Sequence, residues 1–150
     1  MSRADERHDI TSKEYIASID DDTTKNNAII IFDMMSKISG EEPILYGIGT
    51  IGFGVFQYAY DSGRKGESHI LGFYPRKGKT TVYLTDGTTR YSSALSKLGK
   101  HSITGYCIYI KKIDDIDLSI LEQILEQSYA NIVSKSIDGP IMEILWQTEK

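Results

Sequence analysis

Cysteine and long apolar runs are both scarce in this chain, and their scarcity narrows the class of protein. Cys107 is the only cysteine among 150 residues, which excludes an internal disulfide framework and a cysteine zinc cluster. No apolar run approaches the roughly 18–20 residues that a membrane-spanning helix needs. The first residues, MSRADERHDITSK, are charged and lack the apolar centre of a secretory signal. We therefore expect a cytoplasmic protein that does not cross a membrane.

Catalytic signatures are also missing. The histidines His8, His69 and His101 form no HxxxH or HExxH pair, so metal catalysis has no sequence support. The run GKHS at 99–102 lacks the earlier glycine of a phosphate loop, because residue 94 is Ala. We interpret the protein as non-enzymatic. A lone general base at His101 is the enzymatic alternative.

The composition is that of one globular domain with an uneven charge. Hydrophobic residues make up 40% of the chain and charged residues 25%, with a net charge of −4, as in proteins that bury an ordinary core. Eight basic residues and one acid fall between 76 and 112, a balance of +7, and the remainder carries −11. This asymmetry indicates either a surface that binds an anion or a partner, or an ordinary solvated surface with a local bias.

Strand-forming sequence dominates the middle of the chain. Three segments are rich in apolar and aromatic residues, at 50–61, 69–75 and 80–85. Short polar turns at 62–66 and 76–79 separate them. Short turns between consecutive strands indicate antiparallel pairing. A fourth strand is expected at 106–111.

Helical patterns surround these strands. A capping box at Thr11 and Glu14 predicts a first helix, and Thr23 or Thr24 caps a second that ends at Gly40. A further helix is expected over 86–99, and a long one follows an acidic cap at 114, 115 or 117. The predicted fold is α+β, an antiparallel curved sheet with helices packed on one face. Its parts are a flexible tail (1–10), the domain (11–135) and an apolar extension (136–150).

Alternation along the strands assigns side chains to the two sheet faces. Leu71 and Phe73 are expected to point to one face, and Ile70 and Tyr74 to the other. In the same way, Val82 and Tyr83 point to opposite faces, as do Ile108 and Tyr109. One face is therefore aliphatic and covered by helices, and the other is rich in tyrosine, with Tyr58 or Tyr60 as further members. Such a face suits a pocket or contact, or it is simply solvated and partly covered by a tail.

Several segments, in this order and spacing, resemble the YdhG-like family of small bacterial domains, most of unknown function. They are GEEPILY (40–46), IGFGVFQYAY (51–60), GFYPRK (72–77), VYLTDG (82–87), LGKHSITGYCIYIKK (98–112) and IDDIDLSIL (113–121). The resemblance covers about residues 11 to 133 and implies an α+β fold with an antiparallel sheet. Tyr46 departs from it, because many relatives have tryptophan there.

These observations predict a binding module for a small molecule or a protein, with a tyrosine-rich sheet face and a basic rim. The expected ligand-binding residues are Tyr46, Tyr74, Arg76, Lys77, Tyr83, Lys100, His101 and Tyr109. No metal or cofactor is assigned, and the net acidity argues against nucleic acid. The apolar extension, which contains Trp146, needs a surface to cover, either this domain's own sheet or a second copy in a homodimer.

The resemblance also implies an alternative, because one branch of the family consists of frataxin-like iron chaperones. Such proteins hold iron with surface carboxylates, because hard oxygen ligands suit iron in weak, open sites. The acids at helix ends have an ordinary explanation in the helix dipole. The candidate ligands here form two alternative clusters, either Asp20, Asp21, Asp22, Glu41 and Glu42, or Asp114, Asp115 and Asp117.

Overall fold

The structure is a computed structural model that describes residues 11–47, 49–59, 65–134 and 141–146. The expected tail at 1–10, Tyr60, most of the turn at 62–66 and the break at 138–140 lie outside the described residues. The helices are α1 (Ser12–Ala17), α2 (Asp22–Ser39), α3 (Ser92–Leu95) and α4 (Leu118–Val133), with short 3₁₀ turns η2 (Thr89–Tyr91) and η3 (Ile113–Asp115).

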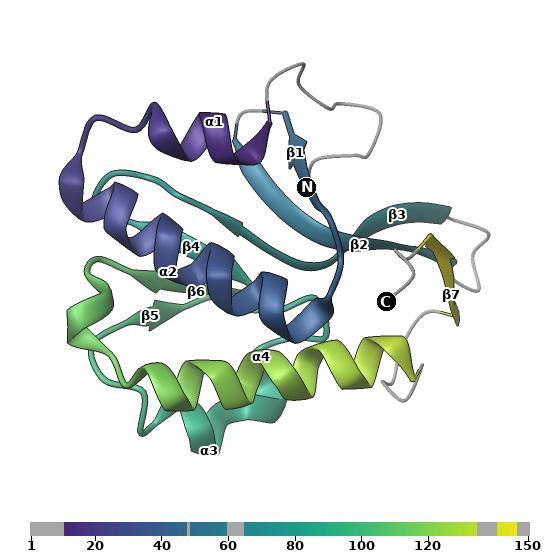
Figure 1. The fold of residues 1–150 in the computed structure, drawn as a ribbon. Coiled ribbons are helices and arrows are strands. Elements are labelled where there is room, and N and C mark those ends of the chain that lie inside the picture. The colour runs from purple at the N-terminus through teal and green to yellow at the C-terminus, as the bar shows by residue number, and fades with distance from the viewer. Residues whose placement is uncertain (1–10, 48, 60–64, 135–140, 147–150) are drawn as a thin grey trace.

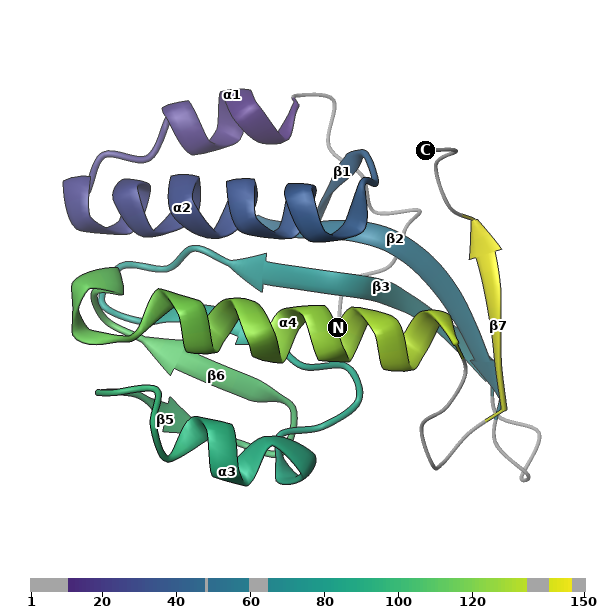
Figure 2. The same cartoon turned by 60° about the horizontal axis from the view of Figure 1, so that its bottom comes forward.

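One antiparallel sheet joins all the strands. They are β1 (Pro43–Tyr46), β2 (Thr50–Ala59), β3 (Lys65–Tyr74), β4 (Thr80–Tyr83), β5 (Ser102–Ile103), β6 (Cys107–Ile110) and β7 (Ile141–Trp146). The order across the sheet is β1-β2-β3-β4-β6-β5, and β7 pairs with the outer part of β2. Figure 1 shows α2 and α4 side by side in front of this sheet, and Figure 2 shows how β2 curves. The predicted α+β fold is confirmed.

The helix ends follow local rules. The capping box at Thr11 and Glu14 is present, and Gly40 ends α2 with a left-handed φ of 66°. The predicted cap of α2 at Thr23 or Thr24 is wrong, because Asp21 occupies that position and accepts a hydrogen bond from the Thr24 backbone N–H. Asp117 caps α4 by accepting from the Ser119 N–H.

The helix expected over 86–99 is much shorter in the structure, where only η2 and α3 are helical. In the same segment the buried carboxylate of Asp86 accepts hydrogen bonds from the Tyr91 hydroxyl at 2.5 Å, the Ser128 hydroxyl at 2.6 Å and the Asn131 amide at 3.1 Å. These bonds hold the segment after β4 against α4. Burial, followed by the Asp86 contact, raises the pKa of Tyr91.

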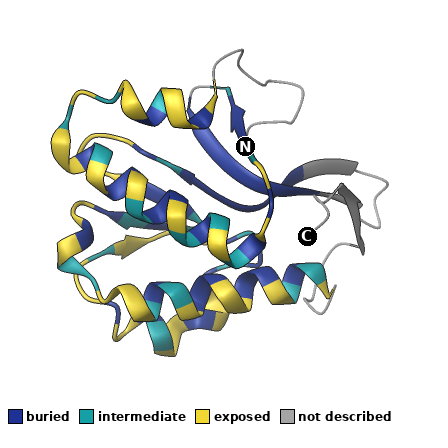
Figure 3. Ribbon diagram, in the orientation of Figure 1, coloured by how far each residue is buried: buried dark blue, intermediate teal, exposed yellow. Residues whose placement is uncertain are grey.

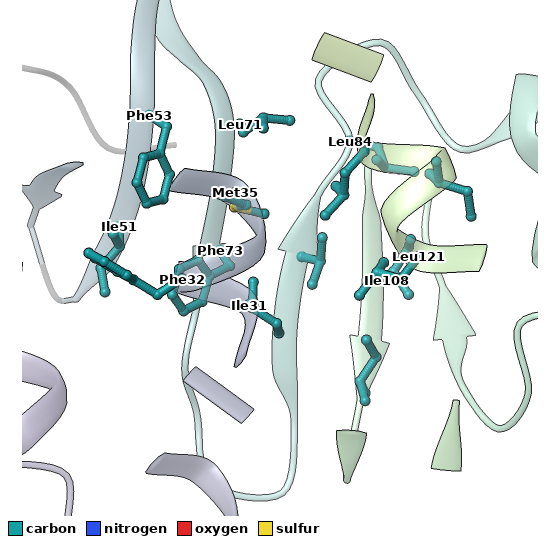
Figure 4. Packing of buried hydrophobic residues seen from close by; sticks show 14 of the residues in the cluster. Ile31, Phe32, Met35, Ile51, Phe53, Leu71, Phe73, Leu84, Ile108 and Leu121 are labelled. Carbon is teal, nitrogen blue, oxygen red and sulfur yellow. The ribbon is translucent and has the colours of Figure 1, made fainter. Parts of the chain in front are cut away.

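The main core lies between the helices and one face of the sheet. Its buried side chains come from α2, α4 and alternate strand positions, among them Ile31, Met35, Phe53, Phe73, Val82, Ile108 and Leu121. Figure 4 shows Phe32 beside Phe53, with ring centroids 5.4 Å apart. Figure 3 shows the pattern along the helices, where buried positions recur on the side toward the sheet. No helix in the described ranges has the length and apolar character needed to cross a membrane.

The alternation of side chains changes where β2 and β3 bend. Gly54 has φ 79°, a conformation that favours glycine, and Ile70 fills the space beside it. Ile70 lies in the same core cluster as Leu71, so the prediction that these two residues face opposite ways is wrong. As a result, His69 lies on the face away from the helices.

The apolar extension forms β7, which pairs antiparallel with β2 of the same chain. The register joins Val55 to Trp146 and Ala59 to Ile141, with a shift between Val55 and Phe56. β1 pairs with the first part of β2 and β7 with the second part. The second part of β2 also pairs with the start of β3. The backbone of the extension therefore has a place within its own chain.

Candidate functional site

The candidate site is the sheet face opposite the helices, where aromatic side chains gather from β1, β3, β4 and β6. Strand register places Gly52, Gly72, Tyr83 and Cys107 in one row across the sheet. The next row contains Tyr74 and Tyr109 on either side of Thr81. Residues directly opposite one another in paired strands share a face. We call the set Tyr46, His69, Tyr74, Tyr83 and Tyr109 the Tyr–His face.

His69 lies at the centre of this face. Its ring centroid is 5.1 Å from that of Tyr83 and 6.1 Å from that of Tyr46. A β-carbon at Gly72 would lie 2.7 Å from both Cε1 and Nδ1 of His69, and one at Gly52 would lie 2.8 Å from its Cβ. Glycine at both positions therefore leaves the space that the imidazole fills.

The His69 imidazole is buried without hydrogen bonds to its ring. The residue is only 1% exposed, and neither ring nitrogen has a hydrogen-bond partner among the residues that the structure describes. Burial disfavours the charged form and lowers the pKa of His69 to about 4. At neutral pH the ring is therefore uncharged and offers one N–H donor and one nitrogen acceptor.

Tyr83 forms the half-buried wall beside His69. Burial raises the pKa of its phenol, a hydrogen bond with Thr50 acts in the opposite direction, and Cys107, Tyr74 and Tyr109 raise it further. The phenols of three neighbouring strands are thus close enough to influence one another. The raised pKa keeps the Tyr83 phenol an uncharged hydroxyl at neutral pH, which can donate a hydrogen bond to a ligand or accept one from it.

Two cations stand at the edge of the face, in the turn between β3 and β4. The guanidinium carbon of Arg76 lies 5.5 Å from the centre of the Tyr74 ring, and Nζ of Lys79 lies 4.5 Å from that of Tyr109. Both residues are exposed. They form the basic rim of the Tyr–His face.

Tyr46 belongs to the interior of the face rather than to its surface. It is 2% exposed and packs with Ile44 and Val55 in a small second core cluster. Its Cε2 lies where a side chain at Gly52 would extend. Tyr46 is therefore placed to support His69 from the β1 side.

The other predicted site residues lie elsewhere. Lys77 influences the Asp21 carboxylate at the start of α2. Lys100 and His101 precede β5, at the edge of the sheet opposite β1; Nδ1 of His101 is 2.7 Å from the Gly99 carbonyl oxygen, and the Lys100 backbone N–H donates to the Asp115 carbonyl. The structure brings together Tyr46, Tyr74, Arg76, Tyr83 and Tyr109 and leaves Lys77, Lys100 and His101 outside that group.

Two of the candidate iron ligands, Asp21 and Asp117, cap helices. Hydrogen bonds with Thr24 lower the pKa of Asp21, and a hydrogen bond with Ser119 lowers that of Asp117. Glu41 is buried. Within the described ranges, no group of three or more histidine, cysteine or acidic side chains is placed to hold a metal ion.

The central residue of the site, His69, was not among the predicted binding residues. Simple alternation puts residue 69 on the same side as Leu71 and Phe73, and only the bend at Gly54 reverses it. The available signal was the repeated glycine in adjacent strands, at 52, 54 and 72, which marks bends and the close approach of another group.

Comparisons with known proteins add no relative. No family model, no curated protein and no solved structure matches this chain.

Proposed function

We propose that this protein is a non-enzymatic module that binds a small organic molecule on the Tyr–His face. The observation that carries the proposal is the buried His69 ring, whose two nitrogens have no hydrogen-bond partner within the described part of the chain. A buried polar group without a partner costs about 1–3 kcal/mol. A bound molecule with a donor or an acceptor offsets that cost when it pairs with the imidazole.

The surroundings of His69 support a ligand with a flat apolar part. Tyr46 and Tyr83 flank the imidazole with their rings, and the glycines at 52 and 72 let the His69 side chain lie close against the strand backbone. Aromatic walls with a few polar groups are typical of small-molecule sites. The half-exposed side of Tyr83 is the side from which a ligand reaches the site.

The family and the cellular location of the protein are proposed from its sequence. The segments that resemble the YdhG-like family imply an α+β fold with an antiparallel sheet, which is the fold observed. We propose membership of that family on this basis, together with the cytoplasmic location supported by the single cysteine.

Native mass spectrometry of the protein purified gently from its host tests the binding function. We expect wild type to carry a stoichiometric organic mass that the Gly72→Ala variant lacks, because the added methyl group displaces His69. The matched control is Gly105→Ala, where an added β-carbon meets nothing within 4 Å, and it should retain the mass. Metal analysis of the same sample tests the iron alternative.

Two results would count against the proposal. One is a wild-type protein without any bound organic mass that also shows no binding in a screen of small aromatic compounds. The other is a bound mass that Gly72→Ala retains at the wild-type level. Circular dichroism of each variant shows whether it is folded, and His69→Phe supplies a second test should Gly72→Ala fail to fold.

A further inference from the structure

We infer that the molecule bound by the Tyr–His face is a planar aromatic or heteroaromatic carboxylate. Its charged end lies at Arg76 and Lys79, and its ring lies toward Tyr83 and His69. This inference rests on the proposed function and adds the chemical class and the direction of the ligand.

The charge of the rim supports an anionic end. Arg76 and Lys79 lie over tyrosine rings, and neither forms an ion pair with a carboxylate among the residues that the structure describes. In the part of the chain that the structure describes, the ion pair found joins Arg90 to Asp86, and the Tyr–His face itself carries no acid. An arginine and a lysine in one short turn are suited to a carboxylate, which a guanidinium binds through two parallel hydrogen bonds.

The other end of the face suits an uncharged ring. The neutral imidazole of His69 can donate one hydrogen bond and accept another, so it complements a ring nitrogen or hydroxyl better than a charged group. Tyr83 presents an aromatic surface next to it, and stacked aromatic pairs are favourable. Charge at one end and aromatic surface at the other give the ligand one orientation.

The spacing of the two ends sets the size of the ligand. The His69 ring lies on Gly72, and Tyr74 is two residues further along β3, about 7 Å away at the rise of a strand. Arg76 extends over the Tyr74 ring. A molecule that reaches both the imidazole and the guanidinium is therefore about 10 Å long, the length of a fused ring pair with a short acidic side chain.

The test is a calorimetric titration of the full-length protein with three probes. Indole-3-acetate has both the ring and the charge, indole-3-acetamide has the ring without the charge, and acetate has the charge without the ring. We expect the acid to bind about tenfold or more tightly than the amide, because charge-assisted hydrogen bonds are stronger than neutral ones. Acetate should give no measurable binding at the same concentrations.

Variants with matched charge locate the contact. We expect Arg76→Gln/Lys79→Gln to reduce the affinity for the acid to that for the amide. Lys97→Gln/Lys100→Gln removes the same charge from exposed positions outside the face and should keep the affinity within about twofold, since distant surface charges are screened by salt. His69→Phe should weaken the binding of both ring compounds.

Three results would overturn the inference: the amide binds as tightly as the acid, the acid does not bind at millimolar concentration, or both double variants lose the same affinity. The proposed function has a separate failure. It fails when neither charged nor neutral aromatic probes give binding that depends on His69. Equal binding of acid and amide that His69→Phe weakens would therefore refute the ligand class and leave the binding site standing.

Discussion

The two faces of the sheet are formed by the same strands but carry different kinds of side chain. On the helix side, Phe53, Phe73 and Val82 are fully buried in an apolar core, and packing stability accounts for them. On the other side, the same sheet carries tyrosines at alternate strand positions and, beyond the bend at Gly54, a buried histidine without hydrogen bonds to its ring. Stability does not account for that histidine, because it costs free energy where it lies. The contrast indicates that one face maintains the fold and the other serves a function.

The largest expected difference in stability is between variants of two neighbouring residues on β3. Phe73→Ala should lower the free energy of unfolding by about 3–5 kcal/mol, because it leaves a cavity in the main core. Tyr74→Ala should cost about 1 kcal/mol or less, because Tyr74 is half-exposed on the other face. Urea denaturation of both variants measures the difference. Equal losses would remove the distinction between the faces.

The polar contact between α4 and the segment after β4 should contribute nearly as much to stability as the core on the helix side. Asp86→Ala leaves the Tyr91 and Ser128 hydroxyls without their acceptor and removes one of the acceptors of the Asn131 amide. We expect a loss of about 3 kcal/mol or more, measured by the same denaturation. The exposed Asp114→Ala is the control and should stay within about 0.5 kcal/mol of wild type. A small effect at Asp86 would show that apolar packing alone holds this segment.

A smaller loss of stability is expected from a substitution where the Tyr–His face is tightly packed. Gly72→Ala places a methyl group against the His69 ring and should cost about 1–3 kcal/mol. Gly105→Ala, in open space, should cost no more than about 0.5 kcal/mol. Thermal unfolding of the two variants supplies the comparison. Equal stability would mean that the imidazole does not lie on Gly72.

The smallest expected effect is at the rim. Arg76→Gln/Lys79→Gln should change the free energy of unfolding by less than about 1 kcal/mol, because exposed charges contribute little to stability. The same variant is expected to lose carboxylate binding. A large loss of stability in chemical denaturation would instead assign the two cations a structural role.

Local sequence rules predicted much of the helix-covered half. The capping box at Thr11, the glycine end at Gly40 and the acidic cap at Asp117 depend on residues within one turn of each other, and all three are observed. The strands of the meander were also predicted, since their alternation and turns are local. The cap at Asp21 was missed because Thr23 and Thr24, whose side chains also suit the N-cap position, follow it closely in the sequence.

The Tyr–His face could be predicted only in part, because its centre depends on contacts between distant segments. Tyr74, Tyr83 and Tyr109 follow from simple alternation. His69 does not, because its direction depends on a bend at Gly54 in the neighbouring strand. Lys100 and His101 were grouped with the face by charge alone, whereas strand order, which is not local information, puts them at the far edge of the sheet.

The most direct test of this account is the titration of His69 itself, followed by NMR of its imidazole Cε1–H. We expect a pKa of about 4, against an ordinary value of 6.5. Between these values the unfolded chain binds a proton that the folded protein excludes, so stability should fall by about 3 kcal/mol as pH drops from 6.5 to 4 and stay level above 6.5.

The variant His69→Phe provides the reference for this titration, since it lacks the ionising group and should lack this part of the pH dependence. A pKa at or above 6.5, with the same pH dependence of stability in wild type and variant, would contradict the account. It would show that the imidazole is solvated or already paired, and that the Tyr–His face holds no buried neutral histidine for a ligand to meet.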